Sequence, residues 1–129
     1  MHKTTNLAIV AFLGMLAIIL GAFGAHALKN KLTFEALQSF ETAVRYQMYH
    51  VIVLLFVNTY TGFSSSFKNK VTLIFLIGIS LFSGSIYAMY LVGIPAKSIW
   101  FITPIGGVFF IVGWAMLFFN FLRLKISNS

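Results

Sequence analysis

Long apolar runs dominate the pattern of hydrophobic and polar positions in this chain. The four runs cover residues 7–27, 44–63, 71–92 and 99–122. Each run is close to the ~20 residues that a helix needs to cross a bilayer. The pattern therefore predicts an all-α membrane protein, an antiparallel four-transmembrane-helix bundle that forms one integral membrane domain over residues 1–129.

The segment before the second run has a different, amphipathic pattern. Thr33 is a typical N-cap residue, and Phe34, Leu37 and Phe40 then recur at helical spacing with polar residues between them. An unbroken helix over residues 34–61 would be about 42 Å long, which exceeds the ~30 Å hydrocarbon core. We therefore expect an amphipathic interfacial segment that bends into the second span, with steep tilt of a straight helix as the alternative.

The polar exceptions within the runs gather at one depth. If the spans alternate in direction, the end of the first, the start of the second, the end of the third and the start of the fourth meet one membrane face. The opposite halves are almost entirely Leu, Ile, Val, Phe and Ala, so we expect no polar path through them. Polar side chains are costly in lipid and indicate a functional site by default. The candidate polar cluster or ligand-binding site consists of His26, Glu41, Arg45, Tyr46, Tyr49, His50, Ser83, Ser85, Tyr87 and Thr103.

Several kinds of chemistry are open to this cluster. Glu41 and Arg45 are four residues apart with the acid first, which favours a helical ion pair that would hold the bend before the second span. His26 and His50 could relay protons or ligate haem or a metal, but zinc usually needs further ligands and the chain has no Cys or Asp. The Ser and Thr hydroxyls more often bond to carbonyls of their own helix, and no nucleophile-elbow pattern is present. We therefore expect no catalytic residue, no metal and no cofactor.

Small residues recur three or four positions apart on the first and third spans. Such stripes allow helix backbones to approach closely in lipid, and they favour close packing of these two spans. The predicted packing residues are Gly14, Ala17, Gly21, Gly24, Ala25, Ser80, Gly84, Ala88, Gly106 and Gly107.

Composition and charge exclude several classes of protein. The chain is 60% hydrophobic and 9% charged, whereas soluble domains carry about 25% charged residues. Its nine Lys and Arg residues lie beside the apolar runs, where they anchor helices to phosphate headgroups, and no basic stripe with interleaved aromatics indicates nucleic-acid binding. The absence of Cys excludes disulfides and thiolate chemistry. The expected partner is the lipid bilayer, with a second copy of the chain or another membrane protein as further candidates.

The distribution of cations encodes the orientation weakly. Arg45 is discounted because it can be paired inside the fold, and the positive-inside rule then favours a cell-membrane protein with both termini in the cytoplasm. The first run superficially resembles a signal peptide, with cleavage near Ala25 or Ala27, but it is too long for a typical h-region, so we interpret it as a retained span. The cations on the proposed cytoplasmic side are Lys3, Lys68, Lys70, Arg123 and Lys125, and those on the other side are Lys29, Lys31, Arg45 and Lys97.

Four blocks of the sequence resemble a known family. They are residues 21–28 (GAFGAHAL), 40–50 (FETAVRYQMYH), 82–87 (FSGSIY) and 102–107 (ITPIGG). In this order they resemble the YgdD-like family of small inner-membrane proteins, also known as domain-of-unknown-function family 423. The resemblance implies a multi-pass, usually bacterial membrane protein with about four helices. It implies no established activity and assigns no catalytic residue.

The leading functional hypothesis is a non-enzymatic accessory or membrane-homeostasis factor with a polar pocket near the non-cytoplasmic face. One alternative is a small oligomeric transporter or channel, although no acid lies at mid-membrane to couple ions. The other alternative is a membrane enzyme or redox carrier that depends on His26 and His50.

Overall fold

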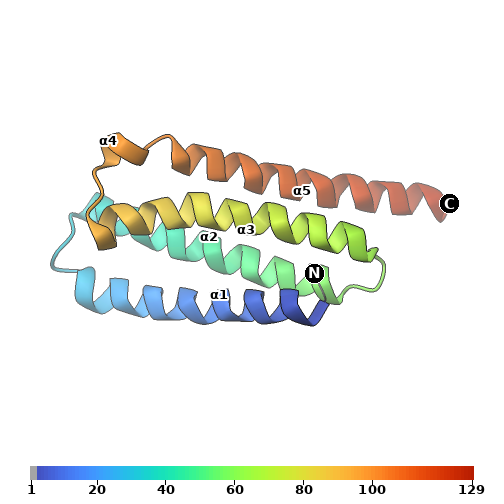
Figure 1. Cartoon of the computed structure of the whole chain (residues 1–129), viewed down its shortest axis with the longest axis horizontal. Coiled ribbons are helices and arrows are strands. Elements are labelled where there is room, and N and C mark those ends of the chain that lie inside the picture. Colours follow the sequence, from blue (N-terminus) through green and yellow to red (C-terminus); the bar gives the residue numbers. More distant parts are fainter. Residues whose placement is uncertain (1–2) are drawn as a thin grey trace.

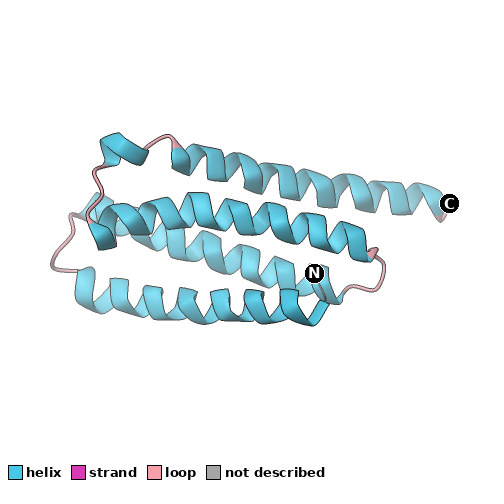
Figure 2. Cartoon of the chain, in the orientation of Figure 1, coloured by secondary structure: helices cyan, strands magenta, loops and turns pink. Residues whose placement is uncertain are grey.

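The structure is a computed structural model, and it describes residues 3–129. The described part of the chain is entirely helical and contains no strand (Figure 2). The long helices α1 and α3 each end in a π-helical turn, and a short helix α4 precedes α5. The elements are α1 (Lys3–Phe23) with its π-turn (Gly24–Leu28), α2 (Phe34–Thr59), α3 (Ser65–Tyr87) with its π-turn (Ala88–Val92), α4 (Ala96–Ile99) and α5 (Ile102–Ser127).

The four long helices lie side by side, and the chain reverses direction at each connection (Figure 1). Helix α2 packs against both α1 and α3, while α5 packs along α3. The two ends of the chain lie at one end of the molecule, and α4 lies at the other (Figure 1). Helix α5 thus occupies an outer position, next to α3 and away from α1.

Three helices are long and apolar enough to cross a membrane within the described residues. They are Lys3–Leu28, Ser65–Val92 and Ile102–Ser127. These helices contain the predicted runs 7–27 and 71–92 and most of the run 99–122. Helix α2 has comparable length but is less apolar than the other three, so length and composition alone do not identify it as a fourth span.

Helix α2 is one uninterrupted helix. The hydroxyl of Thr33 accepts a hydrogen bond from the N–H of Ala36 at 3.2 Å, as expected for an N-cap. The amphipathic turns expected before the second span are the first turns of α2, and they are not a separate element. Their location in the membrane interface stays a prediction. The helix ends at Thr59, four residues before the predicted end of the run.

Glycines on α1 and on the π-turn that follows it allow close contact with α2. A Cβ atom at Gly14 would lie 3.2 Å from the Val51 side chain, and one at Gly24 would lie 2.8 Å from the Phe40 ring. Ala17, between them on the same stripe, is buried. The small-residue stripe of α1 therefore packs chiefly on α2, whereas the sequence favoured packing of the first and third spans on each other.

The seam between α3 and α5 is closer still. A Cβ atom at Gly106 would fall among backbone atoms of Leu81 and Phe82, so the two helix backbones approach directly at this point. Two glycines that were not predicted also belong to this seam, because Gly78 faces the ring of Phe110 on α5 and Gly113 receives an aromatic ring from α3. The buried core continues from this seam to α2 and α1.

Some predicted packing residues lie outside both seams. A Cβ atom at Gly107 would meet nothing within 4 Å, and one at Gly84 would meet only a carbonyl of its own helix. Ala25 and Ser80 are exposed, and the Ser80 hydroxyl donates to the Leu76 carbonyl one turn back in α3. The three-to-four spacing thus selected glycines that face a neighbouring helix, such as Gly14 and Gly106, together with others that do not.

Candidate functional site

The ten predicted polar residues divide into two sets by exposure. His50, Ser83 and Ser85 are buried, and Tyr87 and Thr103 are partly buried. The other five are exposed, one in the π-turn after α1 and four on α2. These exposed residues are His26, Glu41, Arg45, Tyr46 and Tyr49.

The buried hydroxyls connect helices. Ser83 of α3 donates to the backbone carbonyl of Ala43 on α2 at 2.7 Å. The Ser85 hydroxyl donates to the Phe82 carbonyl at 2.9 Å and also lies within hydrogen-bond distance of the Thr103 hydroxyl on α5. Since Ser85 has one hydroxyl proton, Thr103 is the donor in the second bond. These bonds tie α3 to both of its neighbours, so they serve helix packing.

Gln47 is a central polar residue that the sequence interpretation did not select. It is almost fully buried on α2, and its amide nitrogen donates to the Leu13 carbonyl on α1 at 2.7 Å. Its amide oxygen accepts from the Tyr87 hydroxyl on α3 at 2.7 Å. One side chain thereby joins three helices. Gln47 lies two residues after Arg45, so helical geometry places it on the opposite face of α2, which is the inward face.

His50 uses both ring nitrogens within the fold. Its Nδ1 lies 2.6 Å from the Tyr46 carbonyl, and its Nε2 lies 3.1 Å from the indole nitrogen of Trp114 on α5. An indole N–H can only donate a hydrogen bond, so Nε2 of His50 is the acceptor. The ring proton is therefore on Nδ1, which donates a hydrogen bond to the Tyr46 carbonyl. The ring also stacks on Phe110, with centroids 3.7 Å apart and planes 9° apart. His50 therefore holds α2 to α5 as a neutral imidazole.

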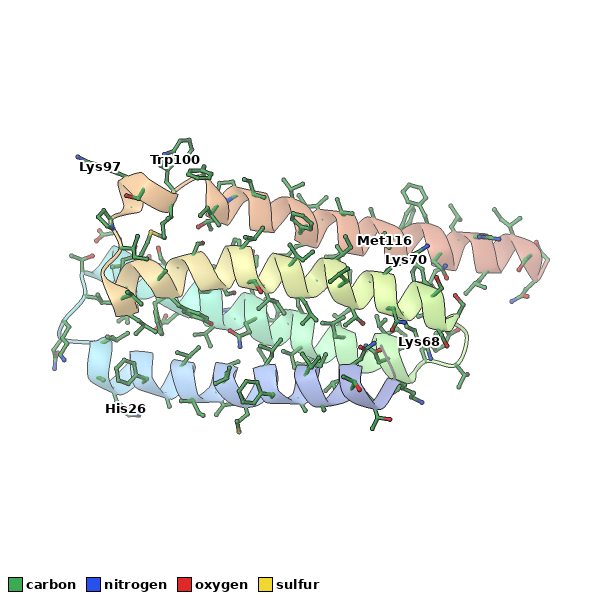
Figure 3. All side chains as sticks on the ribbon, viewed as in Figure 1. His26, Lys68, Lys70, Lys97, Trp100 and Met116 are labelled. Atoms are coloured by element: carbon green, nitrogen blue, oxygen red, sulfur yellow. The ribbon has the colours of Figure 1, made fainter. Side chains whose placement is uncertain are left out.

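His26 is not part of the His50 environment. It is exposed in the π-turn that ends α1, and its side chain points away from the bundle (Figure 3). The aromatic neighbours of His50 come from α2, α3 and α5 instead. Within residues 3–129, no group of three or more His, Cys, Asp or Glu residues is placed to hold a metal ion. The structure does not bring the two histidines together.

Glu41 and Arg45 share a shallow recess at the α1–α2 seam. They line it together with Gly21, Phe40 and Val44, and its volume is about 270 Å³. Both side chains are exposed, and over residues 3–129 no salt bridge joins them. The structure therefore does not show the predicted ion pair, and both charged side chains are exposed.

A second polar cluster lies at the opposite end of the bundle, where the sequence interpretation expected apolar halves. Asn6 of α1 donates to the side-chain oxygens of Asn58 at 2.9 Å and Asn69 at 3.0 Å. Asn58 in turn donates to the Thr72 hydroxyl at 2.9 Å and to the Leu54 carbonyl of its own helix. Asn58 and Thr72 are fully buried. The halves expected to be almost entirely apolar therefore contain a buried polar contact between Asn58 and Thr72, and Asn58 within the run 44–63 was the signal that could have shown it.

An open cleft separates α2 from α5 because α5 packs along α3. Its polar end has a volume of about 440 Å³ and is bordered on α2 by Tyr46 and His50. A neighbouring recess of about 370 Å³ is apolar, and Trp114 lines both. The α5 residues along the polar end are Pro104, Gly107, Val108, Phe110, Ile111 and Trp114. This cleft is a concave surface that is lined by two of the ten predicted polar residues, Tyr46 and His50.

Comparison with known proteins connects these residues to a family. The family model described as "Protein of unknown function (DUF423)" matches residues 20–107. The chain belongs to the DUF423 family. The resemblance noted from the sequence blocks is thereby confirmed. The DUF423 match contains all ten predicted polar residues, and it stops before Trp114.

The DUF423 chain also has close relatives among bacterial membrane proteins. It is 48% identical over 103 residues to a UPF0382 membrane protein of Staphylococcus saprophyticus, covering 80% of this chain and 84% of the relative. It is 38% identical to a UPF0382 membrane protein of Haemophilus influenzae over 95% of this chain and 98% of the relative. Identity to the UPF0382 inner membrane protein YgdD of Escherichia coli is 32%, over 92% and 90% of the two chains. No solved structure matches the chain. The DUF423 chain is accordingly a membrane protein, consistent with its apolar helices.

Proposed function

We propose that this DUF423 chain is a four-span, non-enzymatic accessory or membrane-homeostasis protein that receives a ligand or partner segment in the α2–α5 cleft. The observation that carries the proposal is the position of α5, which packs on α3 and leaves the Tyr46–His50 side of α2 open. The buried polar groups support a non-enzymatic role because they bond between helices, as Gln47 and Ser83 do. The cleft combines apolar walls with few polar groups, as ligand sites commonly do.

Helix α2 is proposed as the fourth span. Its lower hydropathy comes in part from Gln47, His50 and Asn58, and all three side chains are buried among neighbouring helices. Two of its exposed positions in the same stretch, Ile52 and Phe56, are apolar. Polar side chains in membrane helices face the bundle interior, as these do. Four crossings also agree with the two chain ends lying at one end of the molecule (Figure 1).

Single-cysteine labelling tests the four spans and the orientation, because the natural chain has no Cys. We expect Asn30→Cys to react with a membrane-impermeant maleimide in intact cells. Ser64→Cys, at the opposite end of α2, should react only after the membrane is permeabilised. Equal labelling of both variants in intact cells would mean that α2 does not cross. Labelling of Ser64→Cys alone would reverse the proposed cytoplasmic location of the termini.

Neither alternative function gains support from the geometry. A histidine-dependent enzyme or redox carrier needs His26 and His50 at one place, and they face different surroundings. A transport path through one chain would have to connect His50 with the Asn58 cluster. Between these two residues the inward positions of α2 are Val51, Leu54 and Val57, which are buried and apolar. The α2–α5 cleft is therefore the favoured site of action.

Filling the cleft tests whether it is the functional surface. Gly107 lines the cleft, and a side chain there would begin in open space. We expect Gly107→Leu to fold normally but to lose the ability to complement a strain in which the DUF423 gene is deleted, measured by the growth or membrane defect of that strain. Gly107→Ala is the matched control, because it adds one methyl group and leaves most of the cleft open. Full complementation by a normally folded Gly107→Leu protein would contradict the proposal.

A further inference from the structure

A polar recess lies where the last turns of α5 pass the connection between α2 and α3. Its volume is about 330 Å³, and Arg123 supplies its positive charge. Ser64 lines the recess and caps α3 by accepting the N–H of Phe67 at 3.2 Å, so the first turn of α3 begins beside it. Unpaired N–H groups at a helix start favour phosphate oxygens. The lining residues are Gly62, Ser64, Asn120, Arg123, Leu124 and Ser127.

The charge around this recess is of one sign. Both acidic residues of the chain, Glu35 and Glu41, lie in the first turns of α2 at the other end of the molecule. Lys68 and Lys70 lie at the same end as the recess, far from Lys97 (Figure 3). Clustered cations beside a membrane attract anionic lipid headgroups. The local charge therefore complements a phosphate group and not a cation.

The polar recess adjoins apolar surface that a lipid tail fits. Asn120 lines the polar recess, and the next residue, Phe121, lines the apolar recess of about 370 Å³ between α2 and α5. This second recess extends to Trp114, nine residues before Arg123, which is about 14 Å along a helix axis. Its lining residues are Ile52, Val53, Phe56, Trp114, Leu117, Phe118 and Phe121. The cationic and the apolar recess thus follow one another along α5, where Leu117, Phe121 and Leu124 lie on one stripe of the helix.

We propose that this end of the chain binds an anionic phospholipid, with its phosphate on Arg123 and one acyl chain in the apolar recess beside Trp114. The proposal rests on the membrane embedding proposed above, but it does not require a ligand at the Tyr46–His50 end of the cleft. Arg123 is exposed and so is free to meet the phosphate. Guanidinium groups pair with phosphate oxygens through two parallel hydrogen bonds.

Fluorescence quenching by brominated lipids provides a test. The chain has two tryptophans, so Trp100→Phe leaves Trp114 as the reporter. The full-length variant is reconstituted in phosphatidylcholine vesicles that contain a small fraction of phosphatidylglycerol or phosphatidylcholine brominated at mid-chain. We expect an effective affinity about fivefold higher for the brominated phosphatidylglycerol than for the brominated phosphatidylcholine. In the same background, Arg123→Gln should remove this preference.

Lys125→Gln is the matched control, because it removes the same charge from α5 two residues away and Lys125 does not line the recess. The proposal requires that Lys125→Gln retain most of the preference. The proposal is overturned if the two lipids quench Trp114 equally in the Trp100→Phe protein. It is also overturned if Lys125→Gln and Arg123→Gln lose the preference equally, because diffuse electrostatic attraction would then explain the preference. Quenching by neither lipid would show that no acyl chain reaches the recess. None of these outcomes affects the complementation result expected for Gly107→Leu.

Discussion

Replacing Gly106 with alanine is expected to destabilise the protein by about 3 kcal/mol, the upper end of the usual cost of overpacking. The added Cβ would lie less than 3 Å from backbone atoms of Leu81 and Phe82. Backbone atoms cannot rotate aside as a flexible side chain can, so α5 would have to move away from α3. That movement would also loosen the contact of Gly78 with Phe110 along the same seam.

Gly107→Ala is the matched control for this experiment. It makes the same chemical change one residue later, where nothing lies within 4 Å of the new Cβ. Both variants gain up to about 1 kcal/mol from the higher helix propensity of alanine. The difference between their free energies of unfolding therefore reports the cost of the added methyl group at the α3–α5 seam. Unfolding in mixtures of a mild detergent and sodium dodecyl sulfate, followed by circular dichroism, measures the two free energies. Similar stability of the two variants would mean that α3 and α5 do not approach at Gly106.

Replacing Asn58 with leucine is expected to lower the free energy of unfolding by about 2 kcal/mol. The change removes the hydrogen bonds to Asn6 and Thr72, and it leaves both partners buried with unmet hydrogen-bonding groups. A buried unsatisfied polar group costs about 1–3 kcal/mol, whereas one hydrogen bond between membrane helices contributes only about 0.6 kcal/mol on average. The expected loss of stability therefore comes largely from the unmet hydrogen-bonding groups of Asn6 and Thr72.

Thr59→Val provides the control for Asn58→Leu in the next position of α2. The Thr59 hydroxyl is exposed and donates to carbonyls of its own helix, at Leu55 and Phe56. Its loss should change stability by less than about 0.5 kcal/mol, as is usual for surface substitutions. The same detergent unfolding experiment compares the two variants. If Asn58→Leu is as mild as Thr59→Val, the asparagine cluster does not hold the bundle together.

The helices themselves were largely predictable from the sequence. Apolar runs and a helix-capping Thr33 placed the long helices, because backbone hydrogen bonding and hydropathy act locally along the chain. Their neighbours were not predictable in the same way. Helix α5 carries large apolar side chains all round, such as Ile111 and Phe118 on its exposed side. A uniform pattern does not indicate which face packs, so the sequence could not place α5 against α3 and away from α2.

The sequence predicted the depth at which the candidate site residues lie along their helices, but not which face of each helix points inward. Gln47 lies two residues after Arg45, so the two residues occupy opposite faces of any helix, but this spacing does not show that the Gln47 face is the inward one. The sequence did not indicate a role for Trp114, because an indole within an apolar run is typical of a lipid-facing residue. In the structure its N–H donates a hydrogen bond to His50. Asn58 was visible as a polar residue in the second run. Its structural role depends on a hydrogen bond with Asn6, which is 52 residues away in sequence. A contact of this kind follows from the tertiary structure and cannot be predicted from local sequence.

The decisive measurement is an electron cryo-microscopy map of the protein in lipid nanodiscs. We expect α5 packed on α3 and a cleft between α2 and α5, bridged by Trp114 and His50. We also expect elongated density in that cleft beside Trp114. The proposed site is wrong if α5 closes against α2 and leaves no cleft, or if His26 and His50 hold a common ligand.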